Sequence, residues 1–152
     1  MKICLDTNVI IDILGKTDDF QSSFAAVDIA IIRHFQVFIS ITSTPDIAYL
    51  MPRRNLATEP ETRQLLTDMF SLLGVLDARP VDATQALNSG MPDYEDALIA
   101  QIAQRNGIEL ILTRNISDSQ RSPVAVMSPQ EFVDIYKPKD VEYTTIDLAP
   151  GV

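Results

Sequence analysis

The sequence has almost none of the residues that build disulfides and zinc sites. Cys4 is its single cysteine and His34 is its single histidine. Ligand count therefore excludes both a disulfide framework and a metal site made of cysteine and histidine. Because Cys4 lies in an apolar run, we expect a free thiol in a reducing, cytoplasmic setting.

Long hydrophobic runs are also missing. The amino-terminal segment reaches Asp6 before the apolar core of a signal peptide could form. No later stretch approaches the roughly 18 apolar residues that a membrane helix requires. We therefore expect a protein that is neither secreted nor membrane-spanning, and its 152 residues suit one domain.

Basic residues are scarce relative to acidic ones. The chain has 12 Lys and Arg against 21 Asp and Glu, and its formal net charge is −9. This balance argues against an extended basic surface that binds nucleic acid through counterion release alone, and its simplest explanation is solubility. Divalent cations reverse the local sign of an acidic cluster, so the charge does not exclude a phosphodiester substrate.

Short apolar segments alternate with helical patterns along the chain. Strands are predicted at residues 2–5, 37–39, 75–76, 110–112 and 124–126. Helices are predicted near residues 9–14, 20–34, 44–51, 59–73, 81–89, 93–106 and 128–136. This alternation implies right-handed crossovers and a parallel sheet covered on both faces.

Two helix ends carry local signals. Thr44, Pro45 and Asp46 are predicted to be the cap, the first-turn proline and the first-turn acid of one helix. Gly74 is predicted to stop the helix that precedes it.

Polar and acidic residues follow the predicted strands. In a parallel sheet, ligands bind outside the carboxyl ends of the strands, where such residues meet. Carboxylates brought together repel each other unless a cation joins them, and Mg²⁺ and Mn²⁺ prefer oxygen ligands. The residues in these positions, which together predict a divalent metal site, are Asp6, Asp46, Asp93, Asp96, Asn115 and Asp118.

Each acid also has a structural interpretation. Asp6 and Asp93 suit helix caps, Asp46 suits a charge opposing a helix dipole, and Asp118 suits a solvated loop. Thr7 and Asn8, likewise, are common turn formers.

The helix that begins near residue 93 leaves one orientation open. Asp96 shares a stripe with Asp93 and three alanines, which favours an inward direction for its side chain. Glu95 instead aligns with Leu98, Ile99 and Ile102. Periodicity alone therefore does not decide which acid faces the site.

Four segments together resemble the PIN domain family, and more closely its prokaryotic branch that includes the ribonuclease toxins of toxin–antitoxin pairs. Order and spacing agree over about residues 1 to 136. The segments are Leu5-Asp6-Thr7-Asn8-Val9-Ile10, Asp93-Tyr94-Glu95-Asp96-Ala97-Leu98-Ile99-Ala100, Leu112-Thr113-Arg114-Asn115 with Asp118, and residues 123–132.

The resemblance implies a three-layer α/β/α sandwich whose parallel sheet has the strand order 3-2-1-4-5. We expect the PIN-like domain to span residues 1–138. The polar segment after Pro138, residues 139–152, is expected to be a tail that is either loose or a partner-binding arm.

Ser119 stands where the family often has an aromatic residue after its fourth acid. Two ligand positions also depart from the family pattern, because Asp46 stands where glutamate is usual and Asn115 where aspartate is common. Both departures weaken the expected metal affinity.

The resemblance further implies a metal-dependent ribonuclease that uses Mg²⁺ or Mn²⁺, has RNA as its substrate and a small antitoxin as its partner, and forms a homodimer. The expected catalytic residues are Asp6, Asp46, Asp96 and Asp118, with Asp6, Asp96 and Asp118 as metal ligands. The expected supporting residues are Thr7, Asn8, Asp93, Thr113 and Asn115, and the expected phosphate contacts are Arg114 and Arg121.

Two other functions remain open. Asp46 and Asn115 suit a PIN-like module that has lost catalysis and serves as a binding or scaffolding domain. A phosphoaspartyl domain also places aspartate after its first strand. The dehalogenase type is disfavoured because no second aspartate follows two residues after Asp6, and the receiver type because no lysine lies near a strand end where that chemistry needs it.

Overall fold

A computed structural model describes residues 1–143, so residues 144–152 of the predicted tail lie outside the described residues. Five strands form one sheet in which every pairing is parallel. The strand order is β3-β2-β1-β4-β5, which confirms the predicted α/β fold and its 3-2-1-4-5 topology. The strands are β1 (Lys2–Leu5), β2 (Gln36–Ser40), β3 (Gly74–Leu76), β4 (Leu110–Leu112) and β5 (Ala125–Met127).

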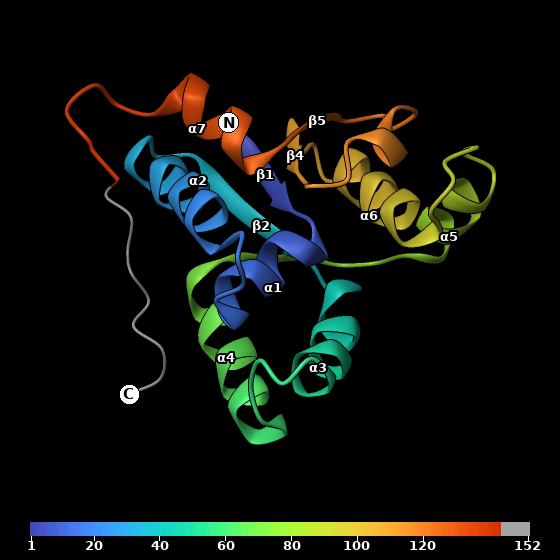
Figure 1. Cartoon of the computed structure of the whole chain (residues 1–152). Helices are drawn as coiled ribbons and strands as arrows, with labels where there is room; N and C mark the ends of the chain where they lie inside the picture. The colour runs from blue at the N-terminus through green and yellow to red at the C-terminus, as the bar shows by residue number, and fades with distance from the viewer. Residues whose placement is uncertain (144–152) are drawn as a thin grey trace.

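Helices lie on both sides of this sheet. Figure 1 shows α5 and α6 on one side, α2 and α7 on the other, and α3 and α4 together at the lower end of the molecule. The helices are α1 (Thr7–Gly15), α2 (Phe20–Ile32), α3 (Ser43–Arg53), α4 (Glu59–Leu72), α5 (Pro80–Leu87), α6 (Tyr94–Arg105) and α7 (Pro129–Tyr136). Among residues 1–143, none of these helices has the length and apolar character needed to cross a membrane.

The sheet separates two apolar cores because successive side chains of a strand point to opposite faces. In β1, Ile3 and Leu5 enter the core shared with α1 and α2. Cys4, between them, enters the core shared with α6. Complete burial raises the pKa of the Cys4 thiol to about 12, so Cys4 acts as a small apolar side chain.

The strand register places the ends of β1, β2 and β4 next to one another. Leu5 pairs with Ile39 on one side and with Leu112 on the other. The backbone N–H of Asp6 then donates to the carbonyl of Leu112 at 2.9 Å. β1 is therefore the central strand, with β2 and β3 on one side of it and β4 and β5 on the other. Parallel sheets bind ligands at the carboxyl end of the strand where the order reverses in this way.

Two predicted helix ends are wrong. Thr44 is not a cap: α3 begins at Ser43, and the Thr44 hydroxyl donates to the carbonyl of Ile41. Gly74 does not stop α4: Leu73 caps that helix, and Gly74 is the first residue of β3. A Cβ atom at Gly74 would lie 2.4 Å from a ring carbon of Phe38, so the close packing of β3 on β2 requires glycine there.

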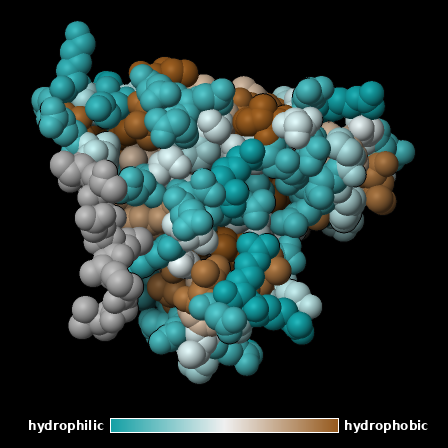
Figure 2. Space-filling view, in the orientation of Figure 1, coloured by the Kyte–Doolittle hydropathy of each residue, from teal (hydrophilic) through white to brown (hydrophobic). Residues whose placement is uncertain are grey.

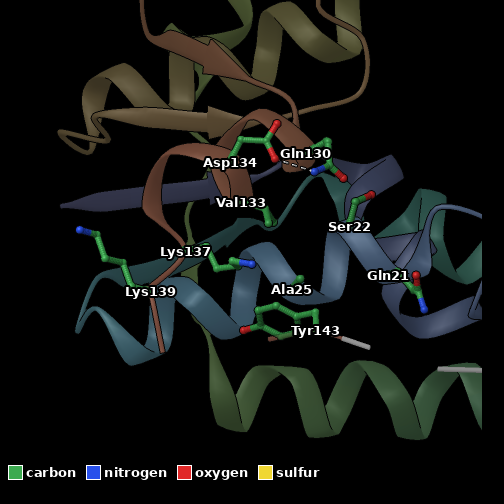
Figure 3. A pocket seen from close by; sticks show the side chains of 9 residues that line it. All are labelled: Gln21, Ser22, Ala25, Gln130, Val133, Asp134, Lys137, Lys139 and Tyr143. Carbon is green, nitrogen blue, oxygen red and sulfur yellow. Dashed lines mark hydrogen bonds between the residues drawn. The ribbon is translucent and has the colours of Figure 1, made fainter. Parts of the chain in front are cut away.

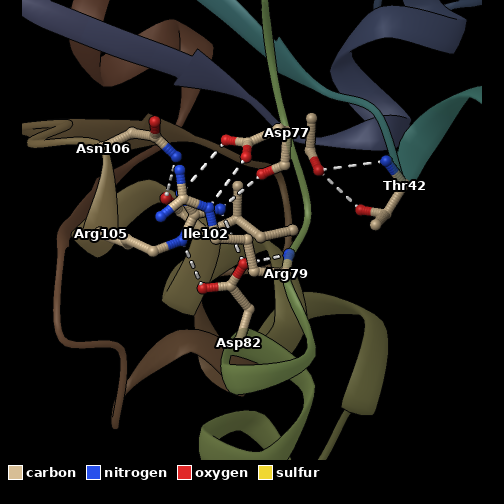
Figure 4. Close-up of polar contacts among 8 residues, drawn as sticks. Thr42, Asp77, Arg79, Asp82, Ile102, Arg105 and Asn106 are labelled. Carbon is tan, nitrogen blue, oxygen red and sulfur yellow. Dashed lines mark hydrogen bonds and ion pairs between the residues drawn. The ribbon is translucent and has the colours of Figure 1, made fainter.

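Arg105, in the last turn of α6, joins α5, α6 and the loop after β3 (Figure 4). Its guanidinium donates to both carboxylate oxygens of Asp82 at 2.8 Å, and to the side chain and the carbonyl of Asp77. The Asp82 side chain is fully buried, and hydrogen bonding to Arg105 lowers its pKa. α6 therefore covers the face of the sheet that carries Cys4, and α5 packs on α6 through ion pairs centred on the buried Asp82.

We expect Asp82→Ala to lower the free energy of unfolding by about 2 kcal/mol, because it leaves a largely buried guanidinium with fewer partners. A lowered carboxyl pKa stabilises the fold above the pKa of the unfolded chain, and this contribution is lost as pH falls through the folded-state pKa. Urea denaturation at neutral and acidic pH measures both effects. Asp77→Ala, at a side chain 56% exposed, is the matched control and should destabilise the protein clearly less.

Candidate active site

Asp6 is the centre of the site. It follows β1 directly and is 3% exposed. Its Oδ1 accepts the backbone N–H of Thr7 at 2.8 Å, and its Oδ2 accepts the hydroxyl of Thr113 at 2.9 Å. Burial raises its pKa to about 6, although both hydrogen bonds oppose this shift and the charge of Glu95 adds to it. Asp6 therefore caps α1 and is also a buried carboxylate in an acidic environment.

Glu95 is a site residue that the sequence analysis did not assign. The hydroxyl of Thr7 donates to its Oε1 at 2.7 Å and lies 2.8 Å from Oγ of Ser43. Burial raises the pKa of Glu95, and the neighbouring Asp46 carboxyl raises it further. Asp46 lies in the first turn of α3, so the strand-end acids of β1 and β2 meet at Glu95. The feature of the sequence that could have indicated this role is the position of Glu95 directly before Asp96.

Asp96 also faces the site, so α6 contributes two adjacent acids. Its Oδ2 accepts the side-chain amide of Asn115 at 3.0 Å. Burial raises its pKa to about 6, and the charges of Asp6, Asp93 and Asp118 raise it further. The backbone N–H of Asn115 in turn donates to the Thr113 hydroxyl at 3.0 Å. The loop after β4 therefore holds both Asp6 and Asp96.

The remaining predicted residues surround this centre. Asp93 caps α6 by accepting the backbone N–H of Asp96 at 3.0 Å. Asn8 is half-buried in the first turn of α1. Asp118 is half-buried in a single 3₁₀ turn, Ser117–Ser119, and its charge raises the pKa of Asp96.

Within residues 1–143, no group of three or more Asp, Glu, His or Cys side chains has the geometry to hold a metal ion. The predicted ligand set of Asp6, Asp96 and Asp118 is therefore not arranged as a direct three-ligand site. A small cavity of ≈ 10 Å³ borders Asp6 and Asp96 and is lined further by Thr113 and Ser119. A cavity of this size is about the smallest that can hold one water molecule.

The two predicted phosphate contacts are engaged elsewhere. The Arg114 guanidinium donates to both oxygens of Asp12 at 2.7 and 3.2 Å and lies 3.3 Å from Asp19. Asp12 is 1% exposed, so this ion pair ties the loop after β4 to α1. Arg121 donates to the carbonyl of Gly90 at 3.2 Å. Both arginines therefore brace loops around the site.

We expect Thr113→Val to destabilise the protein more at about pH 8 than at about pH 5. The Thr113 hydroxyl stabilises ionised Asp6, so its loss raises the Asp6 pKa further and costs about 1 kcal/mol only where Asp6 is ionised. Loss of the acceptor for the Asn115 N–H adds a cost at both pH values. Urea denaturation at each pH measures the difference, and Thr113→Ser, which keeps the hydroxyl, should show none.

Comparison with known proteins identifies the class to which this fold and acidic site belong. A family model described as PIN domain matches residues 2–117. The chain therefore belongs to the PIN domain family, whose members are typically nucleases and generally depend on metal ions. No curated protein matches the sequence at a significant level.

Solved structures of toxin–antitoxin type share the fold. VapBC2 from Rickettsia felis, bound to a DNA fragment from its promoter, contains a chain that is 18% identical with a TM-score of 0.66, covering 84% of this chain and 98% of that one. A toxin–antitoxin complex from Klebsiella pneumoniae gives 22% identity and a TM-score of 0.63, covering 85% and 98%. FitAcB from Neisseria gonorrhoeae contains a chain that is 20% identical with a TM-score of 0.59. The match covers 84% of this chain and 97% of that one. At these identities the similarity establishes the fold.

Proposed function

We propose that this protein is a Mg²⁺- or Mn²⁺-dependent endoribonuclease and the toxin of a toxin–antitoxin pair. One observation carries the proposal: buried Asp6, at the end of the central strand, lies in the electrostatic field of Glu95 and Asp93, and itself raises the pKa of Asp96. These acids come from two elements far apart in the sequence. Repulsion among ionised carboxylates destabilises the folded state, so a cluster of this kind favours a functional role over a purely structural one.

The donor set suits a hydrated hard cation. Mg²⁺ commonly keeps several water ligands and binds through one or two carboxylates, so a direct three-carboxylate cage is not required. Asp6 and Asp96 are the proposed holders, and Asp118 and Glu95 would act through water. A bound divalent ion would supply an activated water and would neutralise charge on the phosphate.

The chain's own residues would prepare this site. Thr113 and the Thr7 N–H fix the two oxygens of Asp6, and Asn115 fixes one oxygen of Asp96. Thr7 also holds Glu95, which provides a long-arm carboxylate beside the shorter Asp46. Asp93 orients the start of α6. Held in this way, the carboxylates need little reorganisation when substrate binds.

RNA as substrate, an antitoxin as partner and a homodimer as assembly are proposed from the family and from its toxin–antitoxin structures. A bound divalent ion would reverse the local negative charge of the acidic edge, which would favour the approach of RNA to a chain whose net charge is −9.

The alternative is a PIN-like binding module without catalysis. Its specific support is Asn115, whose neutral amide donates to Asp96 where a further acid would add negative charge. Isothermal titration of the purified protein with Mn²⁺, run beside cleavage of a structured RNA with Mn²⁺ and with EDTA, separates the two functions. The nuclease proposal expects metal binding and EDTA-sensitive cleavage. Absence of both at millimolar Mn²⁺ would support the binding module.

A further inference from the structure

Two exposed arginines lie at the end of α3 that is remote from the acidic site. Arg53 is in the last turn of α3 and Arg54 is its C-cap. Within residues 1–143, every other arginine pairs with a carboxylate or donates to a backbone carbonyl, whereas Arg53 and Arg54 do neither. In a chain of net charge −9, these two guanidinium groups are therefore available to an anionic ligand.

The lysines near the end of the described chain lie at the other edge of the sheet. Lys137 and Lys139 line a cavity bordered by α2 and α7 (Figure 3). The carbonyl of Tyr136, just before them, accepts a hydrogen bond from Arg33, which caps α2 shortly before β2 begins. This pair of lysines is therefore at the amino-terminal edge of the sheet, opposite the edge that carries Asp6.

α3 begins at the acidic site. Oγ of Ser43, its first residue, lies 2.8 Å from the hydroxyl of Thr7, and that hydroxyl donates to Glu95. Figure 1 shows α3 running from the end of β2 toward the lower end of the molecule, and Figure 2 shows hydrophilic side chains exposed in this region. The helix therefore connects the acidic site with the two arginines.

One side of α3 carries an aromatic ring and a cation in line with an acid of the site. Tyr49 and Arg53 follow Asp46 at spacings of three and four residues, which places all three on one side of the helix. Tyr49 is 55% exposed, and the guanidinium carbon of Arg53 lies 4.1 Å from the centre of its ring. Because the ring is still largely exposed with Arg53 on one face, its other face and its edge are open to a planar ligand.

We propose that α3 binds a single-stranded segment of RNA, with one base stacked on Tyr49 and neighbouring phosphates on Arg53 and Arg54. Arg53 lies about 10 Å along the helix axis from Asp46, so a strand bound here is in line with the acidic site. This inference rests on the proposed function and adds to it a preference for unpaired RNA. A base inside a duplex is stacked on its neighbours, whereas an unpaired base has a face free for the tyrosine ring.

Binding in EDTA tests this contact without a metal ion at the acidic site. Fluorescence anisotropy of a labelled single-stranded RNA measures the affinity. We expect Tyr49→Ala to bind about 5-fold or more weakly, which is the lower end of the range for one stacked base. Tyr49→Phe keeps the ring and should bind like the unmodified protein. The same strand annealed to its complement should bind several-fold more weakly.

The salt dependence of binding tests the two arginines. Removing both, in Arg53→Ala with Arg54→Ala, should reduce the slope of log affinity against log salt by about 1.4, because each phosphate contact on a single strand contributes about 0.7. Lys137→Ala with Lys139→Ala makes the same change in net charge at the other edge of the sheet. This matched control should leave the slope unchanged.

Cleavage in Mn²⁺ separates this inference from the proposed function. Tyr49→Ala should raise the half-saturating RNA concentration and leave the rate at saturation unchanged, because Tyr49 is outside the metal site. If the unmodified protein does not cleave RNA, the nuclease proposal fails, and binding in EDTA still tests α3. Equal binding in EDTA by the unmodified protein and Tyr49→Ala, or no binding of the single strand, would overturn the assignment of α3 even where cleavage is observed.

Discussion

Asp6→Asn is expected to lower the rate of metal-dependent RNA cleavage by well over 100-fold, because loss of an outer-shell metal partner alone costs about 10- to 100-fold. The substitution removes the central negative charge and keeps the side-chain shape. In the unmodified protein the Thr113 hydroxyl donates to Oδ2 of Asp6 at 2.9 Å. In the variant the asparagine NH₂ group can donate to the same hydroxyl, so we expect the fold to be retained. Single-turnover cleavage of a structured RNA in Mn²⁺ measures the loss.

The control for this variant is Asp18→Asn, which makes the same charge change at an exposed position between α1 and α2. It should cleave at the rate of the unmodified protein. Because all variants are purified in the same way, a contaminating ribonuclease would be equally active in every preparation and would show no dependence on Asp6. Asp96→Asn should reproduce the loss because Asp96 is the second proposed metal holder. If Asp6→Asn cleaves at the full rate while remaining folded, Asp6 has no role in catalysis and the nuclease proposal loses its basis.

Divalent metal is expected to stabilise the protein strongly at about pH 8 and weakly at about pH 5. Burial raises the pKa of both Asp6 and Asp96 to about 6, above the ordinary value for aspartate, and the charges of neighbouring carboxylates add to both shifts. The folded state therefore binds more protons than the unfolded state in this range, so stability without metal falls as pH rises through about 4 to 6. Above that range both carboxylates are ionised and repel each other.

Mn²⁺ binds the ionised carboxylates, so its effect should appear as the pH rises past their folded-state pKa. At a free concentration 100 times its dissociation constant, an ion that binds only the folded state adds about 2.7 kcal/mol. Thermal melts with Mn²⁺ or EDTA at each pH measure this, and Asp6→Asn should lose most of the metal effect. An equal shift of the melting temperature at both pH values would point to binding elsewhere on this acidic surface.

Local signals in the sequence were sufficient for much of the architecture. The apolar runs around Ile3 and Ile111 mark strands because burial on both faces requires continuous apolar residues. Ser128 and Glu131 mark the start of α7, where the structure has the expected capping box. The prediction failed at Gly74, because a helix stop and a close strand contact both favour glycine. Only the Phe38 ring on β2 decides between them.

The candidate site divides in the same way. The sequence by itself determined which acids follow strands, and hence that Asp6 and the start of α6 belong to one edge of a parallel sheet. Tertiary structure decided which side chains meet there: Thr7 bonds Glu95 across 88 residues, and Arg114 is taken by Asp12 across 102. The reason is that hydrophobic periodicity describes the faces of one helix or strand. The partner of a charged side chain depends on how separate helices and loops pack together.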